Sequence, residues 1–65
     1  MTDVTWEEVL EIIIQTRETR GINKSEFSKM IGTSLEFVSQ MERKKKKPSI
    51  DTFIKIVNVL KLNFF

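Results

Sequence analysis

Residues 23–47 read NKSEFSKMIGTSLEFVSQMERKKKK, and this stretch decides the fold. Two short helical patterns meet in it at Gly32, and the second pattern runs into five consecutive cations. Asn23 and Glu26 match the capping box, in which each side chain can satisfy a backbone amide at a helix start. The sequence therefore predicts a helix over about 24–31.

The inner face of this first short helix follows from its apolar spacing. We expect Phe27, Met30 and Ile31 to point inward. Ile22 precedes the cap and can contact Phe27 as a hydrophobic staple, which fixes the entry of the chain into the helix. Gly32 then permits a sharp turn that a side chain would strain.

A second short helix is predicted to follow the Ser34 cap, so that the helix-turn-helix unit covers about 24–43. Val38 and Met41 are three residues apart and form its evident inward pair. The remaining positions give a face of mixed chemistry that points outward: Leu35, Glu36, Ser39, Gln40 and Arg43. A major groove accepts one helix and offers its base edges to short side chains, so this face favours a DNA-reading function.

Two further helices are predicted around this unit. A capping box at Thr5-Trp6-Glu7-Glu8 starts the first helix, and Gly21 provides its left-handed stop. Its inward residues recur at helical spacing: Trp6, Val9, Leu10, Ile13 and the stem of Arg17. Ile12 and Ile14 widen this apolar face, either because tertiary packing covers them or because a partner does.

Pro48 and Ser49 close a loop and cap the last helix, which is predicted over about 50–61. Its core stripe is Phe53, Ile56, Val57 and Leu60, with Ile54 and Val59 beside it. No linker or repeat interrupts the chain. We therefore expect residues 1–65 to form a single all-α domain, a compact bundle of four helices with a possible short fifth element at the C-terminus.

Composition excludes most enzyme classes. The 65 residues contain no Cys and no His, which removes thiol and imidazole nucleophiles, an imidazole base and a Cys/His zinc site. We expect no catalysis, cofactor or metal. The longest apolar run, Ile12 to Ile14, is far below the roughly 20 residues of a membrane span, and the acidic N-terminus is unlike a signal peptide. These features predict a cytoplasmic protein without a membrane partner.

Charge is distributed unevenly along the chain. Residues 1–16 carry four acids and no base, whereas residues 17–65 carry eleven bases and five acids. The densest cluster is Arg43, Lys44, Lys45, Lys46 and Lys47. Such a cluster attracts polyanions, so the basic part of the chain is the functional candidate.

The run from Arg17 to Leu60 resembles the phage-repressor and Cro type of helix-turn-helix domain, the Xre family. The matching residues are Arg17, Gly21, Ile22, Asn23, Gly32, Ser34, Val38, Ser39, Glu42, Pro48 and Ser49. Three positions depart from the family pattern, which usually has Gln at Lys24, Ala at Ser28 and Gly at Lys44. We expect Lys44 to leave the helix end poorly defined or to adopt a left-handed conformation.

The resemblance implies specific roles for these residues. It implies base contacts by Ser34, Leu35, Glu36, Ser39 and Gln40. Because both flanks of a recognition helix lie beside the DNA backbone, we expect phosphate contacts from Asn23, Lys24, Arg43 and members of the run Lys44, Lys45, Lys46 and Lys47. Gln40 suits adenine, Leu35 suits a thymine methyl, and Glu36 suits cytosine N4 or merely stabilises the helix start. It also implies an ion pair between Arg17 and Glu42, which ties the first helix to the third.

The family further implies a small transcriptional regulator, most simply a repressor, that binds double-stranded DNA at a palindromic operator as a homodimer. The candidate surfaces for a second subunit or another partner are Ile12, Ile14, Leu62, Phe64 and Phe65. One alternative is an antitoxin whose acidic N-terminus meets a toxin through Asp3, Glu7, Glu8 and Glu11. A second alternative is a protein-interaction module that does not bind DNA.

Overall fold

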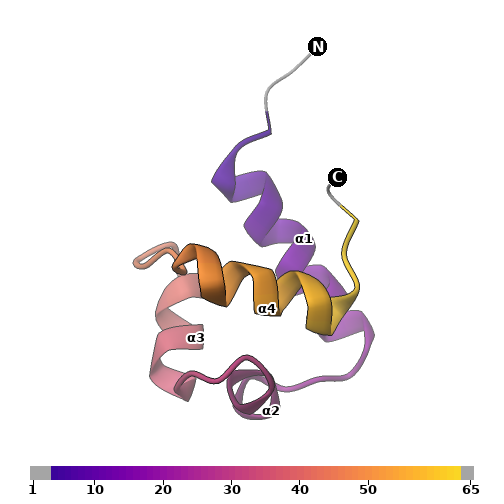
Figure 1. Ribbon diagram of the computed structural model, residues 1–65, viewed down its shortest axis with the longest axis vertical. Helices are drawn as coiled ribbons and strands as arrows, with labels where there is room; N and C mark the ends of the chain where they lie inside the picture. Colours follow the sequence, from indigo (N-terminus) through magenta and orange to yellow (C-terminus); the bar gives the residue numbers. More distant parts are fainter. Residues whose placement is uncertain (1–3, 64–65) are drawn as a thin grey trace.

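The computed structural model describes residues 4–63, and this part of the chain forms four helices and no strands (Figure 1). Their bounds are α1 Trp6–Thr19, α2 Lys24–Met30, α3 Leu35–Glu42 and α4 Ile50–Leu60. The all-α class expected from the sequence is confirmed. None of the helices within residues 4–63 is long and apolar enough to span a membrane.

Each helix starts where a polar side chain accepts a hydrogen bond from a backbone amide in the first turn. Asn23 accepts from the Glu26 amide at 2.8 Å, and the Glu26 carboxylate accepts from the Asn23 amide at 3.3 Å, so the predicted capping box forms. At Thr5 the expectation was only half right. The hydroxyl accepts from the Glu8 amide, but the Glu8 carboxylate then binds the same hydroxyl rather than the backbone.

A residue with left-handed backbone angles follows each of the four helices. Gly21 and Gly32 follow the ends of α1 and α2, both at φ 70°, while Lys44 and Lys61 follow α3 and α4 at φ 65° and 54°. Backbone amides beyond each end close the last turn, as at Lys45, which donates to the carbonyl of Gln40 at 2.8 Å. The end of α3 is therefore sharply defined. Of the two outcomes expected at Lys44, a poorly defined helix end or a left-handed conformation, the second is the one observed.

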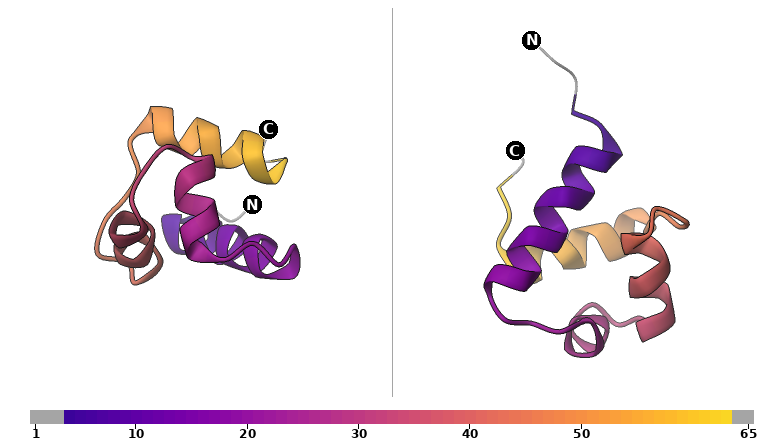
Figure 2. Two further views of the ribbon diagram at one scale, coloured as in Figure 1. Left: turned by 90° about the horizontal axis from the view of Figure 1, so that it is seen from below. Right: turned by 180° about the vertical axis from the view of Figure 1, so that it is seen from behind.

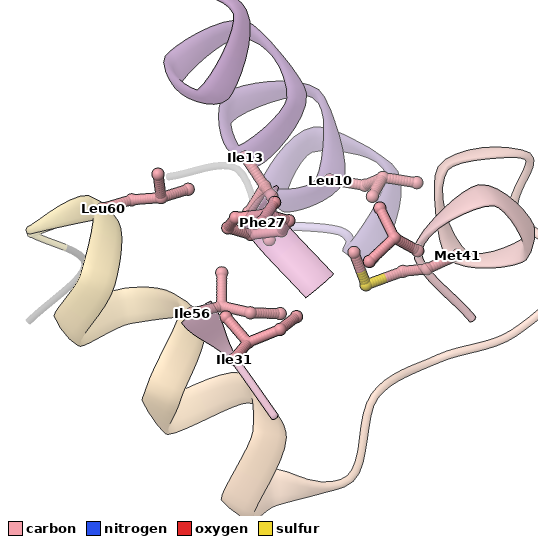
Figure 3. Close-up of a cluster of buried hydrophobic side chains, with 8 residues drawn as sticks. Leu10, Ile13, Phe27, Ile31, Met41, Ile56 and Leu60 are labelled. Atoms are coloured by element: carbon pink, nitrogen blue, oxygen red, sulfur yellow. The ribbon is translucent and has the colours of Figure 1, made fainter. Parts of the chain in front are cut away.

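All four helices contribute to one buried cluster: Leu10, Ile13, Phe27, Ile31, Val38, Met41, Ile56 and Leu60. Phe27 lies at the centre of the labelled side chains, between Ile13 of α1 and Ile56 of α4 (Figure 3). The predicted inward pair of α3, Val38 and Met41, is fully buried.

The predicted inner face of α2 is wrong at one position. Met30 is 47% exposed, and Ser28 is buried in its place. Phe27 and Ile31 are four residues apart and lie on one face of the two-turn helix α2, which sets its orientation. Ser28 lies on the buried flank of this face, and Met30 lies on the exposed flank. The Ser28 hydroxyl is satisfied locally, since it donates to the Ser25 carbonyl at 2.6 Å.

Two of the candidate partner residues are covered by the fold. Ile14 and Leu62 are half-buried against the core cluster, so packing accounts for most of their apolar surface. Ile12 remains 41% exposed. Phe64 and Phe65, like Asp3 at the other terminus, lie outside the described residues.

Helices α2 and α3 cross steeply. Figure 1 views α2 end-on and α3 from the side, and the left view of Figure 2 reverses this. α4 packs across the other helices, and the 43–49 loop that leads into it projects beyond α3. This arrangement buries one side of α3 and leaves the opposite side open.

Candidate nucleic-acid interface

The open side of α3 carries the residues that the sequence indicated as base contacts. Leu35 and Glu36 are exposed, and Ser39 and Gln40 are half-buried one turn later. Residues four apart share a helix face, so the four side chains form two adjacent rows. Ser34 is exposed at the start of α3, and its hydroxyl accepts from the Phe37 amide at 3.0 Å.

Gln40 differs from its neighbours on this face. Its side-chain carbonyl oxygen is buried and has no hydrogen-bond partner within residues 4–63. A buried polar atom that lacks a partner costs about 1–3 kcal/mol. The side chain must therefore turn outward before that oxygen can meet a donor on another molecule.

A buried ion pair fixes α3 relative to α1. The Arg17 guanidinium donates through Nε to Glu42 Oε2 at 2.8 Å and through Nη2 to Glu42 Oε1 at 3.1 Å. Its remaining nitrogen, Nη1, donates to the Ile22 carbonyl at 2.8 Å. The pair is the one that the resemblance implied, whereas the bond to Ile22 was not foreseen because it depends on how the α1–α2 turn folds back.

Lys24 extends this network to α2. Its ammonium lies 4.0 Å from Glu42 Oε1, and the residue is half-buried. A cation in the first turn of a helix is unfavourable for the helix dipole, and the nearby carboxylate offsets that cost. The contact also places the start of α2, including the exposed Asn23, beside the end of α3.

The basic cluster starts at the end of α3 and continues into the loop before α4. Arg43 caps α3, and Arg43, Lys44, Lys45, Lys46 and Lys47 are all exposed. Together with Lys24, these cations gather at the C-terminal end of α3. The expected phosphate contacts therefore lie on one flank of the reading face rather than on both.

A cation at the other end of α3 was missed by the sequence analysis. The Lys55 ammonium, which comes from α4, lies 3.5 Å from the position that a Cβ on Gly32 would occupy. It is therefore close to the C-terminal end of α2, where a positive charge is favourable. No local motif marks Lys55, because α4 must pack across the turn before the two residues meet.

Two surface hollows lie near the start of α1. One is lined by Trp6, Val9, Lys47, Pro48, Ile50 and Phe53, and is largely apolar. The other is lined by Glu7, Glu8, Glu11, Ile12 and Lys44. The second hollow brings the acidic residues of α1 to the basic cluster that follows α3, a proximity that their separation in sequence does not reveal.

Comparison with known proteins agrees with this geometry. A family model described as helix-turn-helix matches residues 13–65, which include the second half of α1 and all of α2, α3 and α4. No curated protein and no solved structure matches the chain.

Proposed function

The chain belongs to the helix-turn-helix family of the phage-repressor and Cro type, and we propose that it reads double-stranded DNA with α3 in the major groove. Members of this family are sequence-specific DNA-binding regulators. In this proposal residues 1–65 act as one domain. The residues that contact base edges are Leu35, Glu36, Ser39 and Gln40. Ser34, the N-cap of α3, lies at the end of the helix that enters the groove first.

The observation that carries the proposal is the firm attachment of α3 with its opposite side left open. Val38 and Met41 anchor the helix in the core, and Glu42 joins it to α1 through Arg17. A helix held at fixed angle presents its side chains to the groove without a large ordering cost on binding. The open side offers a carboxylate, an amide, a hydroxyl and an apolar group, which suit different base edges.

Phosphate contacts are proposed for the polar and basic groups near the C-terminal end of α3. These are Asn23, Lys24, Arg43, Lys45, Lys46 and Lys47. Such contacts fix the register of a protein on the duplex but carry no direct sequence information. The cluster therefore contributes affinity, and the side chains of α3 contribute sequence preference.

We propose that two copies bind a palindromic operator and that the protein acts as a repressor. One α3 reaches only a few base pairs, so specificity requires a second copy on a half-site about one helical turn, roughly 34–36 Å, away. The repressor role rests on the family resemblance, and a promoter-reporter assay with the selected operator tests it: expression should fall when the protein is produced.

Selection of bound duplexes from a random pool tests the reading of DNA by α3. The expected product is a palindrome with half-site centres about 10 base pairs apart. Gln40→Ala should change the preferred base at one position in each half-site, whereas Lys46→Gln should weaken all sequences alike. Lys29→Gln, an exposed cation of α2, is the control for charge. Recovery of unenriched sequences would reject the proposal.

The hollow beside Ile12 favours a second candidate function, that of an antitoxin. Ile12 is exposed on α1 and is flanked by Glu8 and Glu11. An apolar side chain within an acidic surface suits a basic partner protein. If a toxin-like protein is encoded beside this chain, Ile12→Asp should abolish its neutralisation in a growth assay while DNA binding is retained.

A further inference from the structure

Lys44 occupies a backbone conformation that favours glycine. Its φ is 65°, and the equivalent positions after α1 and α2 are Gly21 and Gly32 at φ 70°. A side chain in the left-handed region costs conformational energy. Lysine offers no backbone advantage over glycine at either left-handed position, Lys44 or Lys61, so the two lysines are distinguished by the charges that lie near their side chains.

Acidic side chains of α1 lie near Lys44, although no ion pair within 4.0 Å joins them to it within residues 4–63. Lys44 lines the same surface hollow as Glu7, Glu8 and Glu11 of α1. Glu8 already accepts a hydrogen bond from Thr5, whereas Glu7 and Glu11 lie one turn apart on the same side of the exposed surface of α1. Opposite charges across a small hollow attract one another within the Debye length of about 8 Å at physiological salt.

We propose that Lys44 is a positioning residue, held by Glu7 and Glu11, that fixes the start of the basic loop against α1 instead of neutralising a DNA phosphate. The loop is then attached to α1 at both ends, because Lys47 and Pro48 line the other hollow with Trp6 and Val9. The lysines between these ends, Lys45 and Lys46, face solvent and remain available to a polyanion.

Thermal unfolding of two matched glycine variants tests the attraction without DNA. Lys44→Gly and Lys61→Gly both relieve a left-handed lysine at a helix end and both remove one positive charge. Lys61→Gly should raise Tm by about 4–8 °C at every salt concentration. Lys44→Gly should raise Tm by less than half as much at 20 mM salt, and the two variants should converge in 1 M salt, where the attraction is screened. Equal gains at both salt concentrations would overturn the proposal.

The statement about phosphates rests on the proposed function and has its own readout. The slope of log affinity against log salt for duplex DNA should fall by about 0.9 in Lys46→Gln and stay unchanged in Lys44→Gln. An equal fall in both variants would overturn the proposal. If the wild-type protein fails to bind DNA, the proposed function fails, and the thermal comparison still decides whether α1 holds Lys44.

Discussion

The guanidinium of Arg17 donates hydrogen bonds to both carboxylate oxygens of Glu42, at 2.8 Å and 3.1 Å, and the two side chains are only 6% and 8% exposed. With Nη1 on the Ile22 carbonyl, one side chain of α1 is bonded to the turn before α2 and to the end of α3. The network thereby helps to fix the orientation of α3 relative to α1 and α2. The stability of the fold and the orientation of the candidate reading helix depend on the same pair.

Removal of Glu42 should therefore be costly. Glu42→Ala leaves the buried Arg17 charge without its carboxylate partner, and we expect the free energy of unfolding to fall by about 3–5 kcal/mol in urea denaturation. Glu18→Ala is the control, since Glu18 is 67% exposed and lies 3.8 Å from the same guanidinium. Its loss should cost at most about 1 kcal/mol. Similar costs for the two variants would contradict the buried pair.

The turn between α2 and α3 should respond to substitution mainly through its backbone. Gly32→Ala should lower the free energy of unfolding by about 1–2 kcal/mol, because φ is 70° and a side chain is strained there. The nearest atom to the new Cβ is the flexible Lys55 ammonium at 3.5 Å, an ordinary contact distance. Gly21→Ala has the same φ and open space around it, so it should cost the same. A much larger loss at Gly32 would reveal steric crowding.

The features that the sequence predicted well are local ones. Asn23, Ser34 and Ser49 each cap the helix that was expected to follow, because a cap involves atoms only three residues apart. The inward pair Val38 and Met41 was equally clear, since a single short helix has one apolar side.

The features that were missed depend on neighbouring helices. Ser28 replaces Met30 in the core because packing sets the rotation of a two-turn helix, and its sequence alone does not. The approach of Lys55 to Gly32 and the buried amide of Gln40 likewise arise only after the helices have packed. For the candidate site, the sequence indicated which residues α3 presents and that the basic cluster follows them, but not that Lys24 of α2 lies beside the end of α3.

The exposure of Met30 leads to a direct test of this correction. Met30→Lys should change the free energy of unfolding by no more than about 0.5 kcal/mol, as is usual for an exposed position. Ile31→Lys, one residue later, should prevent folding because it places an unpaired charge in the core. Circular dichroism during urea titration distinguishes them. Unfolding of Met30→Lys would restore the original prediction of an inward Met30.

The basic cluster should make DNA binding strongly dependent on salt. If each subunit neutralises four to six phosphates, log affinity should fall with log salt with a slope of about 3.6 to 5.4 per subunit. Fluorescence anisotropy with a short duplex at several salt concentrations gives this slope directly. An affinity that does not change with salt would contradict the role of Arg43, Lys45, Lys46 and Lys47 in binding phosphates.

Gln40 should show a conflict between stability and recognition. Its buried carbonyl oxygen is unpaired within residues 4–63, so Gln40→Leu replaces a destabilising polar atom with an apolar group of similar size. We expect the free energy of unfolding to rise by about 1 kcal/mol in urea denaturation. The same variant loses an amide that can bond to a base edge, so discrimination at one base pair per half-site should fall by about 1–3 kcal/mol in competition binding. Ser39→Ala, on the same face, is the control for stability, because it removes a polar group that is not among the buried atoms without a partner. A destabilised Gln40→Leu variant would mean that the amide is satisfied in the free protein, and unchanged discrimination would mean that it does not read a base.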